Sequence, residues 1–196
     1  MRNFILILFC LSTLFSNAIV AHKQHAHVHG QAKAEMVISN LSIRTQLTIP
    51  ALSVIGFEYF PKSEEDKQAV NTAIATLNNT DLFTFYRDMG WFSDDEKLAV
   101  TILQKSANFE GGEPDAEDNA QHAHDHDHNH DHETHTDFVI NIMYELKEDF
   151  KIDVISTSIF SKFPNLDELH LNVVTDETQN EYELSSKKSK IFIKGD

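Results

Sequence analysis

Apolar and polar residues alternate along several short stretches of the chain, and this pattern predicts β-strands. The first stretch spans residues 25–40, and the second, residues 41–49, carries apolar residues or Thr at every other position. A hairpin through Ser39 and Asn40 would join the two, and Pro50 would end the second strand. Further strands are expected at residues 98–103, 138–144, 150–155, 169–174, 181–184 and 191–194.

One stretch has helical spacing instead. Ser63, followed by three acidic residues, forms a capping-box-like start, and the apolar residues between Ala69 and Leu77 fall on one helical face. Residues 81–91 are rich in aromatic side chains and ambiguous, and we expect a short helix there that Gly90 ends. Many short strands with one or two helices predict a single α+β domain built on antiparallel β-sheet.

A long polar segment interrupts this pattern at residues 110–137. It contains ten acidic residues and seven histidines, has neither Lys nor Arg, and has only alanines as apolar side chains. Such a composition cannot offset its ordering entropy by burial, so the whole segment is expected to be a mobile, disordered loop. A loop of this length inside a domain is usually functional.

The first residues of the chain have the layout of a secretory signal peptide, with Arg2 followed by an apolar run and then small residues up to Ala21. Cleavage there would leave residues 22–196 as one domain, without membrane insertion and without the only cysteine, Cys10. Taking Arg2 from the 16 basic residues leaves 15 against 31 acidic residues, a formal charge of −16. This surface charge argues against nucleic-acid partners and favours cations. Export without disulfides suggests the periplasm.

The imidazoles of the long segment favour metal binding, because neutral His is the commonest metal ligand and carboxylates complete sites for zinc. In a flexible chain, any two or three of them can converge on one ion, so several exchanging sites are expected. A solubilising linker, a pH sensor and an interior tag are the alternatives. The candidate ligands of this segment are His122, His124, His126, His128, His130, His132, His135 and Asp137.

A second group of histidines, His25, His27 and His29, precedes the first predicted strand. On a strand, side chains two residues apart share a face at roughly 6.6 Å, so His27 and His29 could reach one zinc ion. Gly30 would allow another segment to approach closely. A frayed His-rich tail is the alternative. His170 is expected to be a lone surface histidine without a metal-binding role.

Four blocks of the sequence carry a family resemblance: HVHG, the block IPALSVIGFEYFPKSEEDKQAV, the His/Asp segment, and FSKFPNLDELHLNVVT. Together they resemble the zinc-binding periplasmic proteins of the ZrgA type, over roughly residues 26–175. The resemblance implies a soluble periplasmic protein that binds zinc and passes it to an uptake transporter or its binding protein. It carries over His27, His29, Glu58 and the His-rich segment as ligands, although Glu58 could equally be a structural carboxylate.

Two features depart from the family pattern. Tyr59 stands where the family usually has His, and the paired cysteines of many members are absent. If that His is normally a ligand, the ordered site is weakened or completed differently, and His135 and Asp137 are the candidate substitutes.

Three classes of function compete for these residues. A zinc-binding module without enzymatic activity is the leading hypothesis. A zinc hydrolase has little support, because the chain has no HExxH, GxSxG or deaminase pattern. A nickel or copper storage or resistance protein is the third, since imidazole sites alone do not select zinc.

Overall fold

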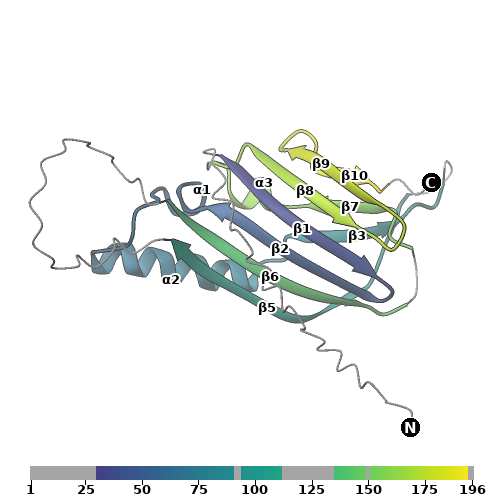
Figure 1. Cartoon of the computed structure of the whole chain (residues 1–196), viewed down its shortest axis with the longest axis horizontal. Helices are drawn as coiled ribbons and strands as arrows, with labels where there is room; N and C mark the ends of the chain where they lie inside the picture. Colours follow the sequence, from purple (N-terminus) through teal and green to yellow (C-terminus); the bar gives the residue numbers. More distant parts are fainter. Residues whose placement is uncertain (1–29, 91–93, 112–134, 149–150, 194–196) are drawn as a thin grey trace, which may run out of the picture.

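The structure is a computed structural model that describes residues 30–90, 94–111, 135–148 and 151–193. The larger of its two sheets has six strands in the order β5-β6-β2-β1-β8-β9 (Figure 1). These strands are β1 (Gln31–Ser39), β2 (Ser42–Pro50), β5 (Val100–Gly111), β6 (Thr136–Leu146), β8 (Glu168–Val174) and β9 (Gln179–Ser185). All neighbours in this sheet are antiparallel except β1 and β8, which are parallel.

The smaller sheet has the strand order β10-β7-β3-β4, and its pairs are antiparallel. Its strands are β3 (Phe83–Arg87), β4 (Glu96–Lys97), β7 (Val154–Thr157) and β10 (Lys190–Phe192). Three helices complete the described fold: α1 (Ala51–Ile55), α2 (Glu64–Asn79) and α3 (Ile159–Lys162). The predicted single α+β domain, mainly of antiparallel sheet, is confirmed.

Strand alternation places the core on one face of the larger sheet. In β1, Ala32, Ala34 and Met36 are buried, whereas Lys33 and Glu35 point outward and are exposed. On the buried side, α2 contacts β5 and β10 contacts β9, and Figure 1 shows α2 beside β5 with the smaller sheet towards β9. The outward side is called the open face below.

Two local predictions are confirmed in detail. Ser39 pairs with Ser42 across the predicted hairpin, and Asn40 takes the positive φ of 50° that the turn requires. At the start of α2, the Ser63 hydroxyl accepts a 3.0 Å hydrogen bond from the Asp66 amide, and the Ser63 amide donates to Asp66 at 3.2 Å. This is a complete capping box.

Several boundaries were predicted wrongly. Residues 81–91 do not form a helix: Phe83 and Phe85 alternate into the core and pair with β7, so part of this segment is β3. The expected loop is also too long, because residues 110–111 belong to β5 and residues 136–137 to β6. Thr136 is only 1% exposed there. The strand expected from residue 150 begins at residue 154, and α1 and α3 bring the helices to three.

One end of the larger sheet gathers the residues of interest. β1, β6 and β8 begin there, and β2, β5 and β9 end there. Gly30 immediately precedes β1, and its carbonyl accepts hydrogen bonds from the amides of Asp167 at 2.9 Å and Glu168 at 3.1 Å. A side chain at residue 30 would meet Asp167 at 2.6 Å, and φ is +77°, so glycine is required. We call this the Gly30 end.

Candidate metal centre

The predicted ligands divide into two groups. His25, His27, His29 and the six histidines from His122 to His132 lie outside the described residues. Glu58, His135 and Asp137 are described, and all three lie near the Gly30 end of the larger sheet, where β2 gives way to α1 and β6 begins. The HVHG motif ends at Gly30, so the chain also enters the described fold at this end.

A short helix positions Glu58. β2 runs directly into α1, and Gly56 closes this helix in the left-handed conformation, with φ of 83° and its amide donating to the Leu52 carbonyl at 3.1 Å. Phe57 then packs against the core. The left-handed turn at Gly56 and the packing of Phe57 together hold Glu58 at the edge of the core.

Glu58 and His135 come together although they are far apart in sequence. His135 Nδ1 lies 3.3 Å from Glu58 Oε1, and the two side chains are 25% and 22% exposed. Donors around a tetrahedral zinc ion with bonds of about 2.0–2.1 Å are separated by about 3.3–3.4 Å. The pair therefore has the spacing of two ligands of one ion, with both side chains partly exposed although Nδ1 itself is buried.

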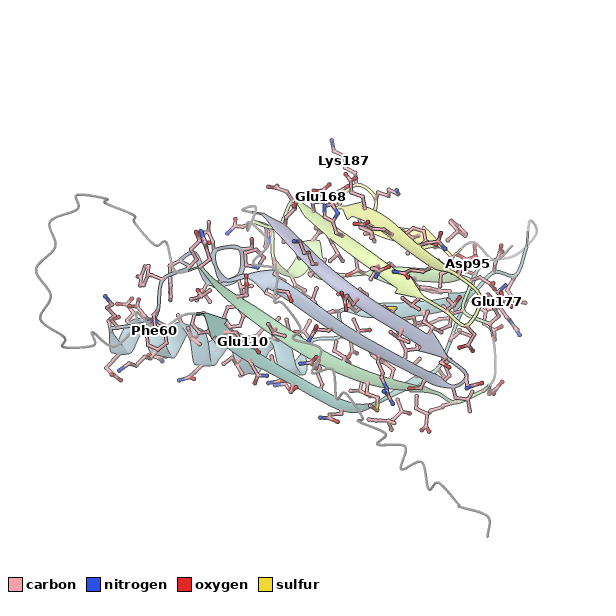
Figure 2. All side chains as sticks on the ribbon, in the orientation of Figure 1. Phe60, Asp95, Glu110, Glu168, Glu177 and Lys187 are labelled. Atoms are coloured by element: carbon pink, nitrogen blue, oxygen red, sulfur yellow. The ribbon has the colours of Figure 1, made fainter. Side chains whose placement is uncertain are left out.

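Asp137 extends this pair. It lies two residues after His135, so both side chains take the same side of the extended chain, and in the sheet it stands between Pro50 and Glu110. Figure 2 labels Glu110 at this end of β5. Nitrogen and carboxylate donors together form the ligand set that zinc accepts. Glu58 and His135 are thus in contact, and Asp137 lies two residues farther along the same extended chain.

Tyr59 turns to a different neighbour. Its ring stacks on Phe57 with centroids 4.6 Å apart, and its hydroxyl lies 3.4 Å from an Asp66 oxygen in the first turn of α2. Phe57 and Tyr59 thus share one side of the chain, while Glu58 between them reaches His135. The position where the family resemblance predicts a His therefore packs on Phe57 and reaches Asp66.

A second His-containing group on the open face was missed by sequence reasoning. His170 Nε2 lies 3.2 Å from Glu168 Oε2, and its Nδ1 lies 3.5 Å from Glu181 Oε1. Glu183 stands directly opposite His170 in the β8–β9 pairing. We call these four residues the His170 cluster. The available signal was the alternation in ELH and EYE, which puts each acid or His of a strand on one face.

The carboxyls of the His170 cluster influence each other. A hydrogen bond with Glu183, then one from the Gln31 amide and the proximity of the His170 ring, lower the pKa of Glu168. The same hydrogen bond, with the negative charge of Glu168, raises the pKa of Glu183. The two carboxyls are therefore close enough to influence each other's ionisation, with opposite effects on their two pKa values.

Neither group is a complete set of metal ligands. As the side chains of the described ranges stand, no three or more His, Cys, Asp or Glu residues among them form a group that could hold a metal ion. Among the same residues, no helix is long and apolar enough to cross a membrane.

Comparison with known proteins identifies the family. No curated protein sequence matches the chain. A family model described as "ZrgA family zinc uptake protein" matches residues 26–193, which include the HVHG motif, Glu58, the His-rich segment and the His170 cluster. The match covers nearly all of the described fold and supports a role in zinc uptake, with zinc as the ion handled. The chain belongs to the ZrgA family of zinc uptake proteins.

Proposed function

We propose that the protein is a periplasmic zinc-binding protein that captures zinc and delivers it to an uptake system. The observation that carries this proposal is the Glu58–His135 pair, whose 3.3 Å donor spacing suits one zinc ion and which lies where the His-rich segment rejoins the sheet. Zinc here is cargo. The partner would be a zinc uptake transporter or its binding protein, and the chain performs no catalytic step.

Two further sets of ligands complete the proposed function. His27 and His29, supported by His25, would approach the Glu58–His135 pair from Gly30, and Asp137 would supply a further oxygen. The histidines from His122 to His132 would collect additional ions with lower affinity, because imidazoles at every other position offer many exchanging combinations of ligands. The ordered site would then hold one ion more firmly than the segment does.

The proposed location follows from the first residues of the chain. Residues 1–21 would act as a signal peptide and leave residues 22–196 in the periplasm, which is consistent with a zinc uptake family and with a single cysteine inside the leader. Export would bring the protein to zinc before the ion crosses the inner membrane.

The decisive experiment measures metal in the exported, untagged protein. Mass spectrometry of material purified without added metal should find zinc, and titration should find one tight site and several weaker ones. Protein that stays empty in micromolar zinc would refute the proposal, and preferential loading with nickel or copper from an equimolar mixture would favour the storage alternative. Affinity should fall from pH 7.5 to 5.5, because imidazole ligands must be deprotonated.

A further inference from the structure

The His170 cluster lies on the open face at the same end of the sheet as the Glu58–His135 pair, but three strand spacings away. β6 and β8 are separated by β2 and β1 in the sheet order, which amounts to about 14 Å at ordinary strand spacing. Figure 2 labels Glu168 at this end of β8, away from Glu177 in the β8–β9 turn. No ligand of the first pair can therefore complete a site at His170 without a large movement.

We propose that Glu168, His170 and Glu183 form a second divalent-cation site, in which His170 Nε2 and one oxygen from each carboxylate bind a single zinc ion. This site goes beyond the proposed function, because it needs none of the histidines before Gly30 or between β5 and β6. All three ligands belong to β8 and β9, which are held in register by main-chain pairing.

The imidazole presents the donor atom that such a site needs. His170 Nε2 is shielded from solvent and makes no hydrogen bond of acceptable geometry, although Glu168 Oε2 is only 3.2 Å away. The contact is therefore one of proximity without alignment. A separation of 3.2 Å is close to the 3.3–3.4 Å or so that separates two ligands of one tetrahedral zinc ion.

Neighbouring residues hold these ligands in the manner of a second coordination shell. Glu181 lies 3.5 Å from Nδ1, the other ring nitrogen, and can orient the ring by accepting its N–H. The Gln31 amide donates to Glu168 Oε2 and fixes that carboxylate at the start of β8. His170 and Glu181 also line a groove of about 570 Å³ on the open face, so one side of the ring borders solvent while Nε2 is covered.

The third ligand requires a small rearrangement. Glu183 is exposed and lies beside Glu168, so its side chain must turn towards the ion. Two ionised carboxylates would balance the charge of the divalent ion. Lys33, opposite His170 on β1, and Lys188 oppose binding, but three carboxylates outweigh these two positive charges. A site of three protein ligands and water would exchange its ion readily.

Nuclear magnetic resonance of the exported protein during zinc titration tests this site separately from the others. Saturable shifts are expected in the amides of residues 168–172 and 181–185, with resonances near Glu58 and His135 shifting at lower zinc concentration. Glu183→Gln should weaken the β8–β9 response at least tenfold. Glu35→Gln removes the same charge from the open face next to Asn172 and serves as the matched control, with an expected change of less than about twofold.

The outcomes separate the two sites. Shifts near His135 with none in β8 and β9 up to millimolar zinc would overturn the second site and leave the proposed function intact. Shifts in β8 and β9 with none near His135 would support the second site and overturn the ordered site of the proposed function. An equal response of the Glu183→Gln and Glu35→Gln variants would also overturn the second site, because binding would then reflect surface charge alone.

Discussion

His135 and His170 make similar contacts in different surroundings. Each places a ring nitrogen 3.2–3.3 Å from a glutamate oxygen at the Gly30 end of the larger sheet. The glutamate of His135 comes from a distant part of the chain and is held by α1 and Gly56, whereas the carboxylates around His170 lie on its own strand and the next one. The comparison shows that the fold decides which carboxylates lie beside each histidine, and therefore which ligands each histidine could share an ion with.

The largest expected effect comes from His135. His135→Ala should weaken the tightest zinc site by roughly 100-fold or more, because loss of a ligand should cost at least as much as loss of a supporting residue. Competition with a chromophoric chelator measures this constant. Gln46→Ala, on the open face of β2, is the control and should leave it within about twofold. Similar constants for both variants would remove His135 from the ordered site.

A combined variant tests whether the two groups are separate. At about 14 Å apart, His135→Ala and Glu183→Gln should affect zinc binding independently, so their free-energy changes should add within about 0.5 kcal/mol. Isothermal titration calorimetry of both single variants and the double variant completes the cycle. A coupling above about 1 kcal/mol would mean that the two histidines share one ion or one moving element.

The two histidines also show which candidate ligands could be predicted from the sequence alone. His135 was predicted as a ligand because it ends a run of histidines, and Glu58 because the family resemblance includes its GFE block. His170 was dismissed because Glu168 and Glu183 look like ordinary surface charges until β8 and β9 are paired. Pairing is a long-range property, and it decides which alternating side chains face each other.

Long-range strand pairing also explains the errors in the predicted fold. Strong local signals, such as the capping box at Ser63 and the turn at Asn40, were sufficient to place α2 and the first hairpin. The strand around Phe85 was read as a helix because its neighbours in β7 are more than sixty residues away in the chain. The last residues of β5 were assigned to the predicted loop because they are polar and because this outer strand is paired along only one edge.

A medium effect is expected on stability, away from both histidines. Ser63→Ala removes the cap of α2 and should lower the free energy of unfolding by about 1 kcal/mol at neutral pH, without changing zinc binding. Urea denaturation at several pH values measures the loss, with Gln68→Ala in the same helix as the control. A changed zinc dissociation constant would contradict the prediction that the cap of α2 does not affect zinc binding.

The pH dependence of this effect has a definite sign. The hydrogen bond with Ser63 is the main reason why the pKa of Asp66 lies below its ordinary value of 3.8. A lowered folded-state pKa stabilises the fold above the unfolded value, and the contribution is lost as pH falls through the folded value. The difference between Ser63→Ala and the original protein should therefore shrink below about pH 4. A constant difference down to pH 2 would show that Asp66 does not contribute through its charge.

The smallest effect is expected at Tyr59, where the family resemblance predicts a His. Tyr59→His introduces that imidazole, but the Tyr59 side chain stacks on Phe57 and reaches Asp66 of α2, while Glu58 reaches His135. An imidazole in that position would face the capping box, so zinc affinity should change by less than about twofold. Tyr59→Phe, which keeps the ring and loses the hydroxyl, separates stacking from hydrogen bonding. A tenfold gain in zinc affinity for Tyr59→His alone would show that the segment after Gly56 can turn towards His135. Zinc binding at the ordered site would then depend on movement of the residues after Gly56 as well as on the Glu58–His135 contact.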